Sequence, residues 1–87
     1  MNQNNRTEER IPLPKECVLF NQFDLIKAET VDISKIGLEV KTDRTLQFIN
    51  GCELAVSIPS MGFSLAKLMW IRKDSNNTTR LGLKFLY

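Results

Sequence analysis

The chain has 87 residues, of which 43% are hydrophobic and 25% are charged. These values are typical of one soluble globular domain with a single core, and they exclude a disordered chain. Twelve Lys and Arg residues against ten Asp and Glu residues give a net charge of +2, which is too small for a surface that binds polyanions in general.

The first segment, residues 1–14, is polar and charged and ends in Pro12 and Pro14. Each proline keeps its own backbone and that of the preceding residue extended, and it supplies no N–H donor. We therefore predict a single domain over residues 1–87, in which residues 1–14 form a flexible arm and residues 15–87 form the barrel described next.

Six segments show the alternation or the turn-bounded apolar runs that are typical of strands. These segments are residues 16–20, 24–33, 38–41, 52–58, 63–72 and 80–86. Between the third and the fourth, residues 42–50 are ambiguous, because Asp43 is suited to cap a short helical turn and Gly51 to end it. Six short strands with at most one helical turn predict an all-β fold, a six-stranded antiparallel β-barrel that closes on itself and leaves no sheet edge exposed.

The same alternation predicts which side chains form the core. In the second strand, Val31 and Ile33 would face inward. Trp70 continues the alternation of Ala66 and Leu68, which indicates a core residue or a lid over the barrel. Three phenylalanines are further core candidates: Phe48, Phe63 and Phe85.

Residue types that are missing or isolated exclude several functions. The chain has no histidine, so His-based general-base and triad chemistry is absent and we predict that the chain is not an enzyme. Cys17 and Cys52 lack C-x-x-C spacing and are interpreted as reduced, buried side chains, so we expect no metal and no cofactor. The N-terminus is polar and no apolar run approaches roughly 20 residues, which predicts a cytoplasmic protein without membrane insertion.

Two short motifs carry the candidate chemistry. Arg6 and Arg10 are four residues apart, so they lie on one side of the arm whether it is extended or makes a helical turn. Asp32 and Ser34 would share the outward face of the second strand, and Gly37 closes the following turn, where a missing Cβ permits a positive φ or close approach to a ligand. Each motif alone also fits an ordinary structure, namely a solvated tail and a turn in which Asp32 or Ser34 accepts from backbone amides.

An R-x-x-x-R motif followed by D-x-S-x-x-G resembles the PilZ family, bacterial receptors for cyclic di-GMP. The resemblance extends over nearly the whole chain, because further landmarks follow the family's order: residues 10–12, Gly51, Trp70 and residues 81–85. It implies a barrel whose arm folds over cyclic di-GMP. The ligand-binding residues that it implies are Arg6, Arg10, Asp32, Ser34 and Gly37.

Each of these residues has a defined role in such a site. The arginines would donate to phosphates and to the O6 and N7 atoms of guanine. Asp32 would accept the N1 and N2 protons of guanine, a pattern that adenine lacks. Ser34 would bond a phosphate or a base edge, and Gly37 would offer its backbone N–H. Asn5 stands where some family members carry a further arginine, which favours one bound nucleotide per site.

The resemblance also leaves questions of output and alternatives open. The chain lacks the C-terminal helix of many relatives and an attached effector domain, so the signal would pass through a downstream protein partner, a dimer or a fused effector domain in a longer parent chain. One alternative is a PilZ-like module that binds only a protein. Another is a barrel that binds single-stranded nucleic acid with Trp70 and Phe63 as stacking platforms. The small net charge disfavours it, and we expect no DNA or RNA partner.

Overall fold

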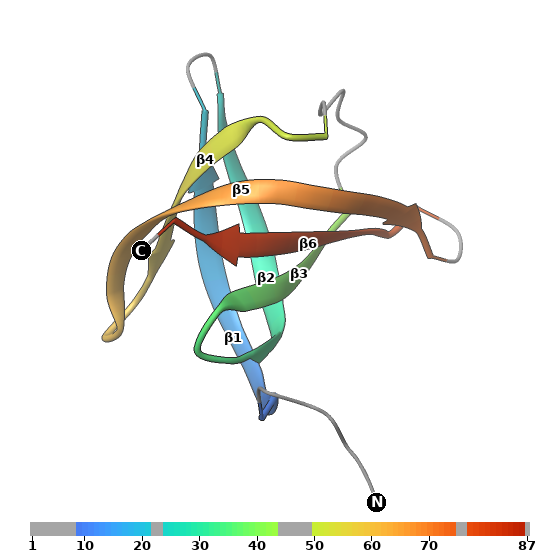
Figure 1. The fold of residues 1–87 in the computed structure, drawn as a ribbon. Coiled ribbons are helices and arrows are strands. Elements are labelled where there is room, and N and C mark those ends of the chain that lie inside the picture. Colours follow the sequence, from blue (N-terminus) through green and yellow to red (C-terminus); the bar gives the residue numbers. More distant parts are fainter. Residues whose placement is uncertain (1–8, 22–23, 44–49, 75–76, 87) are drawn as a thin grey trace, which may run out of the picture.

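The strands of this chain close into a barrel in a computed structural model that describes residues 9–21, 24–43, 50–74 and 77–86. The strands are β1 Ile11–Phe20, β2 Leu25–Ile33, β3 Gly37–Thr42, β4 Glu53–Ile58, β5 Gly62–Lys73 and β6 Thr79–Phe85. Each is antiparallel to its neighbours in the order β1-β2-β3-β6-β5-β4, and β4 returns to β1 to complete the circle (Figure 1). The predicted fold class is confirmed.

Strand β1 begins at Ile11, earlier than the strand predicted at residues 16–20. Ile11 pairs with Ile33 and Pro12 pairs with Asp32, so the end of β2 supplies partners for residues that the sequence assigned to the arm. The prolines are compatible with this pairing because their fixed φ suits an extended strand and the register shifts just after Pro12. Strand β1 therefore begins at the residue that directly follows Arg10.

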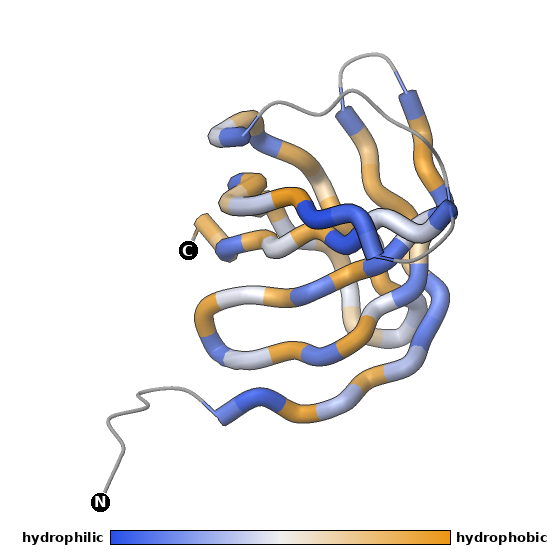
Figure 2. The backbone as a smooth tube through the Cα atoms, turned by 90° about the vertical axis from the view of Figure 1, so that its right-hand side faces the viewer, coloured by the Kyte–Doolittle hydropathy of each residue, from blue (hydrophilic) through white to orange (hydrophobic). Residues whose placement is uncertain are grey.

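The interior of the barrel is apolar. Side chains alternate between the core and the surface, and hydropathy alternates along the strands accordingly (Figure 2). The buried apolar residues are Cys17, Leu19, Ile26, Leu38, Val40, Leu54, Val56, Ile58, Ala66, Leu68, Leu81 and Leu83. Two buried threonines satisfy their hydroxyl groups on backbone carbonyls: Thr30 donates to Leu13, and Thr42 donates to Lys27 at 3.0 Å.

A β-bulge in β2 reverses the alternation near its end. Thr30 pairs with Val40 of β3 and Asp32 pairs with Glu39, so Val31 is an additional residue with no partner in this register. Val31 is half-buried, whereas Ile33 packs against the core. Of the two residues expected to face inward, only Ile33 therefore does so, because the bulge resets the phase between them.

A second bulge in β5 corrects the expectation for Trp70. Leu68 pairs with Leu83 and Trp70 pairs with Gly82, so Met69 is the additional residue. Trp70 consequently points outward and is 37% exposed. A strict alternation after Leu68 would have placed it inside, and the inserted residue is the physical reason that it is not a core side chain.

The three phenylalanines expected in the core differ in outcome. Phe63 is 65% exposed, because it pairs with Ser57 on the outer face of β4. Phe85 is partly buried and packs against the core. Phe48 lies outside the described residues, as does most of the helical turn expected at residues 42–50.

The two cysteines occupy different environments and form no disulfide with each other. Cys17 is buried, and this burial, together with the nearby charge of Glu29, raises the pKa of its thiol to about 11. The thiol therefore stays protonated at neutral pH. Cys52 is only partly buried and packs against the edge of the core. Within the described ranges, no helix has the length and apolar character needed to cross a membrane.

Candidate ligand-binding site

The turn between β2 and β3 is organised by Ser34. Its backbone N–H donates to the carbonyl oxygen of Gly37 at 2.9 Å. Its Oγ accepts from the N–H groups of Gly37 at 3.2 Å and Ile36 at 3.3 Å. Ser34 thus shapes the turn, as the ordinary interpretation of the motif required, and any contact of its hydroxyl with a ligand stays a prediction.

Gly37 is needed for close packing and not for an unusual φ. The positive φ angles in the described part of the chain belong to Gly51 at 91°, Gly62 at 105° and Ser60 at 64°. At Gly37 a Cβ would lie 2.3 Å from the carbonyl oxygen of Leu83 in β6. The absence of a side chain therefore allows the start of β3 to approach β6.

Arg10 and Asp32 are brought together although they are 22 positions apart. The Arg10 Nε atom donates to Asp32 Oδ1 at 2.8 Å, and Nη2 lies 2.6 Å from the same oxygen. Their side chains are 33% and 23% exposed, so the pair lies at the surface in contact with water. The cause is the pairing of Pro12 with Asp32, which leads Arg10 past the end of β2. Arg6, the other predicted arginine, lies outside the described residues.

Asp32 belongs to a row of outward-facing residues that crosses four strands. It pairs with Glu39 of β3, Glu39 pairs with Gly82 of β6, and Gly82 pairs with Trp70 of β5. At Gly82 a Cβ would lie 2.1 Å from the Trp70 Nε1 atom, so the indole lies directly over the glycine. The guanidinium carbon of Arg72 is 5.1 Å from the Trp70 ring centroid, close enough for a cation–π contact.

Arg80 neutralises the carboxylate in the middle of this row. It donates to Glu39 Oε2 from Nη1 at 2.9 Å and to Asp74 Oδ2 from Nε at 3.1 Å. The hydrogen bond to Glu39 and, as a smaller effect, the hydrogen bond to Asp74 raise the pKa of the Arg80 guanidinium above its ordinary value. Asp32 and Glu39 can therefore lie side by side, because each is paired with its own arginine.

A groove of about 290 Å³ lies beside this row. Arg10, Gly37, Trp70 and Lys84 contribute to its lining, whereas Asp32 and Ser34 do not. A larger hollow of about 480 Å³ shares no lining residue with it, and none of the predicted site residues that the structure describes lines this hollow. Besides the carboxylate of Glu39, which is paired with Arg80, the groove therefore contains an arginine, a lysine and an aromatic ring, the groups that bind phosphates and flat bases.

Sequence reasoning missed Trp70 and Lys84 as residues of this groove. Trp70 was assigned to the core or to a lid over the barrel, and it was considered as a stacking platform only in the nucleic-acid alternative; Lys84 was not singled out. A signal was present in Gly82, because a glycine inside a strand often marks the close approach of another group. That signal does not name the group, since the pairing of Gly82 with Trp70 depends on the bulge at Met69.

A family model for the PilZ domain matches residues 4–87 of the chain. No curated protein sequence matches it. Among solved structures with this fold is the Bacillus subtilis Inhibitor of motility (MotI/DgrA), with a TM-score of 0.83 and 18% identity over 100% of this chain and 44% of that chain. Escherichia coli YcgR in complex with c-di-GMP gives a TM-score of 0.70 and 20% identity, covering 93% of this chain and 38% of that chain. The PilZ domain of Escherichia coli YcgR with c-di-GMP gives a TM-score of 0.72 and 21% identity, covering 95% of this chain and 79% of that chain.

Gly37 and Gly82 both line the groove, and replacing each with alanine tests how closely the neighbouring groups pack against it. Gly37→Ala should lower the free energy of unfolding by roughly 2 to 3 kcal/mol, because the new methyl group meets backbone that cannot move aside. Gly82→Ala should cost about 1 kcal/mol or less, because the exposed indole of Trp70 can rotate away. Urea denaturation measures both, and the fluorescence of the single tryptophan should shift to the red only in Gly82→Ala. Equal losses of stability would contradict this account of Gly37.

Proposed function

This chain belongs to the PilZ domain family, and we propose that it is a receptor for cyclic di-GMP in the bacterial cytoplasm. Family membership and the cyclic di-GMP complexes of YcgR with the same fold support the proposal. The chain spans 44% and 38% of the length of two of the similar structures. The proposal therefore concerns the domain, with output passing to a protein partner or a fused effector domain.

The observation that carries the proposal is the pairing of Arg10 with Asp32 beside the groove. Guanine presents acceptors at O6 and N7 and donors at N1 and N2, so it is recognised by an arginine and a carboxylate that lie next to each other. In the proposed complex, Asp32 accepts the N1 and N2 protons, and Arg10 donates to O6 and N7 or to a phosphate. Arg6, Ser34 and Gly37 complete the proposed contacts as the motifs imply.

The existing ion pair makes this exchange energetically possible. An exposed pair such as Arg10 and Asp32 contributes at most about 1 kcal/mol to stability. A hydrogen bond from a ligand to a charged group contributes roughly 1.5 to 3 kcal/mol. A guanine can therefore take over the Asp32 carboxylate at little net cost, and the pair holds both side chains near their binding positions until it arrives.

Trp70 and Lys84 extend the proposed site to the base face and the phosphates. The Trp70 ring lies over Gly82, the guanidinium carbon of Arg72 is 5.1 Å from the ring centroid, and the ring is partly exposed. A base stacked on such a ring gains about 1 to 3 kcal/mol. Lys84 lines the same groove and supplies a cation for a phosphate. The groove would thus hold one molecule of cyclic di-GMP, in keeping with Asn5 in place of a further arginine before Arg6.

Calorimetric titration of the purified chain tests the proposal directly. Cyclic di-GMP should give a saturable signal, whereas GTP and cyclic di-AMP should give none at the same concentrations. A stoichiometry of one ligand per chain would support the single-nucleotide site. No signal with cyclic di-GMP would favour the alternative of a PilZ-like protein-interaction module.

Replacement of Arg10 should affect binding far more than folding. Arg10→Ala should weaken cyclic di-GMP binding roughly 10- to 100-fold, which corresponds to about 1.5 to 3 kcal/mol. The melting temperature without ligand should change little, because the lost ion pair is exposed. Lys73→Ala removes a cation from an exposed position outside the groove and is the matched control. Unchanged affinity in Arg10→Ala would remove Arg10 from the site.

Replacement of Trp70 separates stacking from hydrogen bonding. Trp70→Ala should weaken binding about 5- to 100-fold, and Trp70→Phe should retain most of the affinity because a ring remains available. Discrimination against cyclic di-AMP should persist in both variants, since Asp32 and not the ring reads the base edge. The opposite order of the two variants would show that Trp70 acts through the fold.

The arm should become ordered when the ligand binds. Charged and Asn-rich residues before Ile11 offer few apolar groups to pack, whereas two guanidinium groups can bind a dianion. Backbone NMR relaxation of residues 6–9 should show restricted motion only with cyclic di-GMP, whereas Arg10 is already held by its ion pair with Asp32. At a free ligand concentration about 100 times the dissociation constant, the fold should gain about 2.7 kcal/mol. Equal order with and without ligand would refute the proposed switch, even where binding is observed.

A further inference from the structure

A continuous apolar face covers the outside of four strands. One row across the sheet joins Leu25 of β2, Phe20 of β1, Ala55 of β4 and Leu65 of β5. The next row joins Lys27, Val18, Ser57 and Phe63 in the same strand order. We call the apolar members of these rows the outer apolar face: Val18, Phe20, Leu25, Ala55, Phe63 and Leu65.

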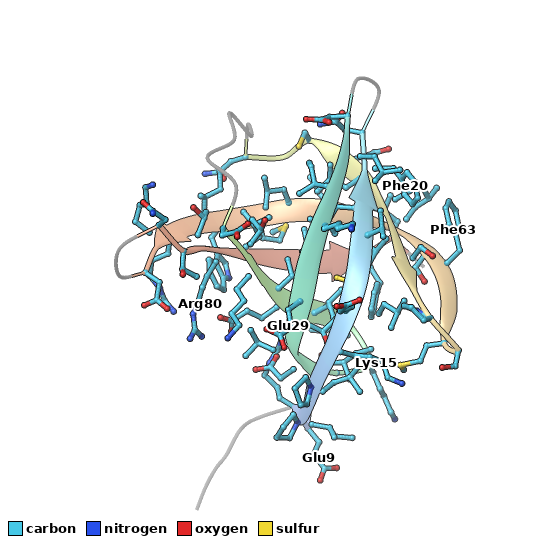
Figure 3. The ribbon with its side chains drawn as sticks, turned by 180° about the vertical axis from the view of Figure 1, so that it is seen from behind. Glu9, Lys15, Phe20, Glu29, Phe63 and Arg80 are labelled. Atoms are coloured by element: carbon cyan, nitrogen blue, oxygen red, sulfur yellow. The ribbon has the colours of Figure 1, made fainter. Side chains whose placement is uncertain are left out.

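The large side chains of this face are in contact with water. Phe63 is 65% exposed, Leu25 is 53% exposed and Leu65 is 36% exposed. The rings of Phe20 and Phe63 are 6.4 Å apart and tilted by 44°, so they form one surface instead of two isolated side chains. Both rings lie at one side of the barrel, and Arg80 lies at the opposite side (Figure 3).

The size of the outer apolar face fits a second folded chain. If a fully exposed large side chain has on the order of 200 Å² of accessible surface, these three exposures amount to roughly 300 Å². Patches of this size on single chains are often functional. Because only about 60% of a protein interface is apolar, the face corresponds to roughly 500 Å² per partner, at the lower limit for a specific dimer.

We propose that the outer apolar face is the contact between two copies of this chain. A two-fold axis that runs between β1 and β4, parallel to the strands, sets β2 of one copy against β5 of the other. Phe20 then faces the partner's Ala55, so that a large side chain meets a small one. Leu25 faces the partner's Leu65. The row is therefore complementary to itself, which a symmetric contact between identical surfaces requires.

The charges around the face are compatible with self-association. Lys27 is the one charged residue in the two rows, and the same axis sets it over the partner's Phe63, where a cation–π contact replaces repulsion. The next positions along β4 and β5 carry Glu53 and Lys67, which have opposite signs and pair across the two strands. No two like charges are brought face to face within these rows. The inference does not depend on nucleotide binding, because the face shares no residue with the groove.

Sedimentation of the full chain from about 5 µM to about 500 µM tests the proposal. The unaltered chain should change from monomer to dimer over this range, and Phe63→Lys should remain monomeric because its charge would face the partner's Lys27. Ile11→Glu is the control, since Ile11 is 56% exposed and lies outside the face. It should dimerise like the parent. A parent chain that stays monomeric, or a Phe63→Lys chain that dimerises normally, would overturn the proposal.

A side-chain exchange tests the register of the contact. Ala55→Phe should weaken the dimer at least about 10-fold, because two large rings would then meet on each side of the axis. The double variant with Phe20→Ala added should restore dimerisation, since a large residue again faces a small one. Circular dichroism checks that every variant is folded. Loss of the dimer in the double variant would refute this axis, and a monomeric parent that binds lipid vesicles would assign the face to a membrane.

Discussion

Two inserted residues determine what the barrel presents to its surroundings. The bulge at Val31 sets Asp32 on the outer surface, and the bulge at Met69 does the same for Trp70. A strict alternation from the buried Thr30 would have placed the Asp32 carboxylate in the core, where an unpaired charge costs several kcal/mol or more. The register shifts at Val31 and Met69 therefore place Asp32 and Trp70 in the same outward-facing row.

Local patterns in the sequence are sufficient to predict the six strands and the barrel. They are insufficient for the bulges, because an inserted residue changes the relation between two strands and not the composition of either one. The same limit explains why Trp70 was assigned to the core or to a lid over the barrel. The family resemblance assigned Arg10 and Asp32 to one site, but it did not predict that the two side chains contact each other. Its physical cause, the early start of β1 at Ile11, depends on pairing with the distant end of β2.

The pairing of Arg10 with Asp32 also bears on how a ligand could be recognised. In a dry interior such a pair would be difficult to separate, because each charge would be left without a partner. At the surface, water solvates both groups during the exchange. A site that must exchange an internal partner for a ligand therefore benefits from being shallow. Because neither side chain excludes water by itself, the exclusion of water from a bound ligand would depend on the Trp70 ring and on the proposed closing of the arm.

Strand β5 carries residues of both proposed contacts. Before its bulge, Phe63 and Leu65 belong to the outer apolar face, and after the bulge Trp70 belongs to the groove. A change in the twist of β5 at Met69 would move the two surfaces relative to each other. If the two events are coupled in this way, the coupling is reciprocal: dimerisation must change nucleotide affinity by the factor by which the nucleotide changes dimerisation. A bulge that creates the groove would then also be the point at which a bound ligand alters the contact between chains.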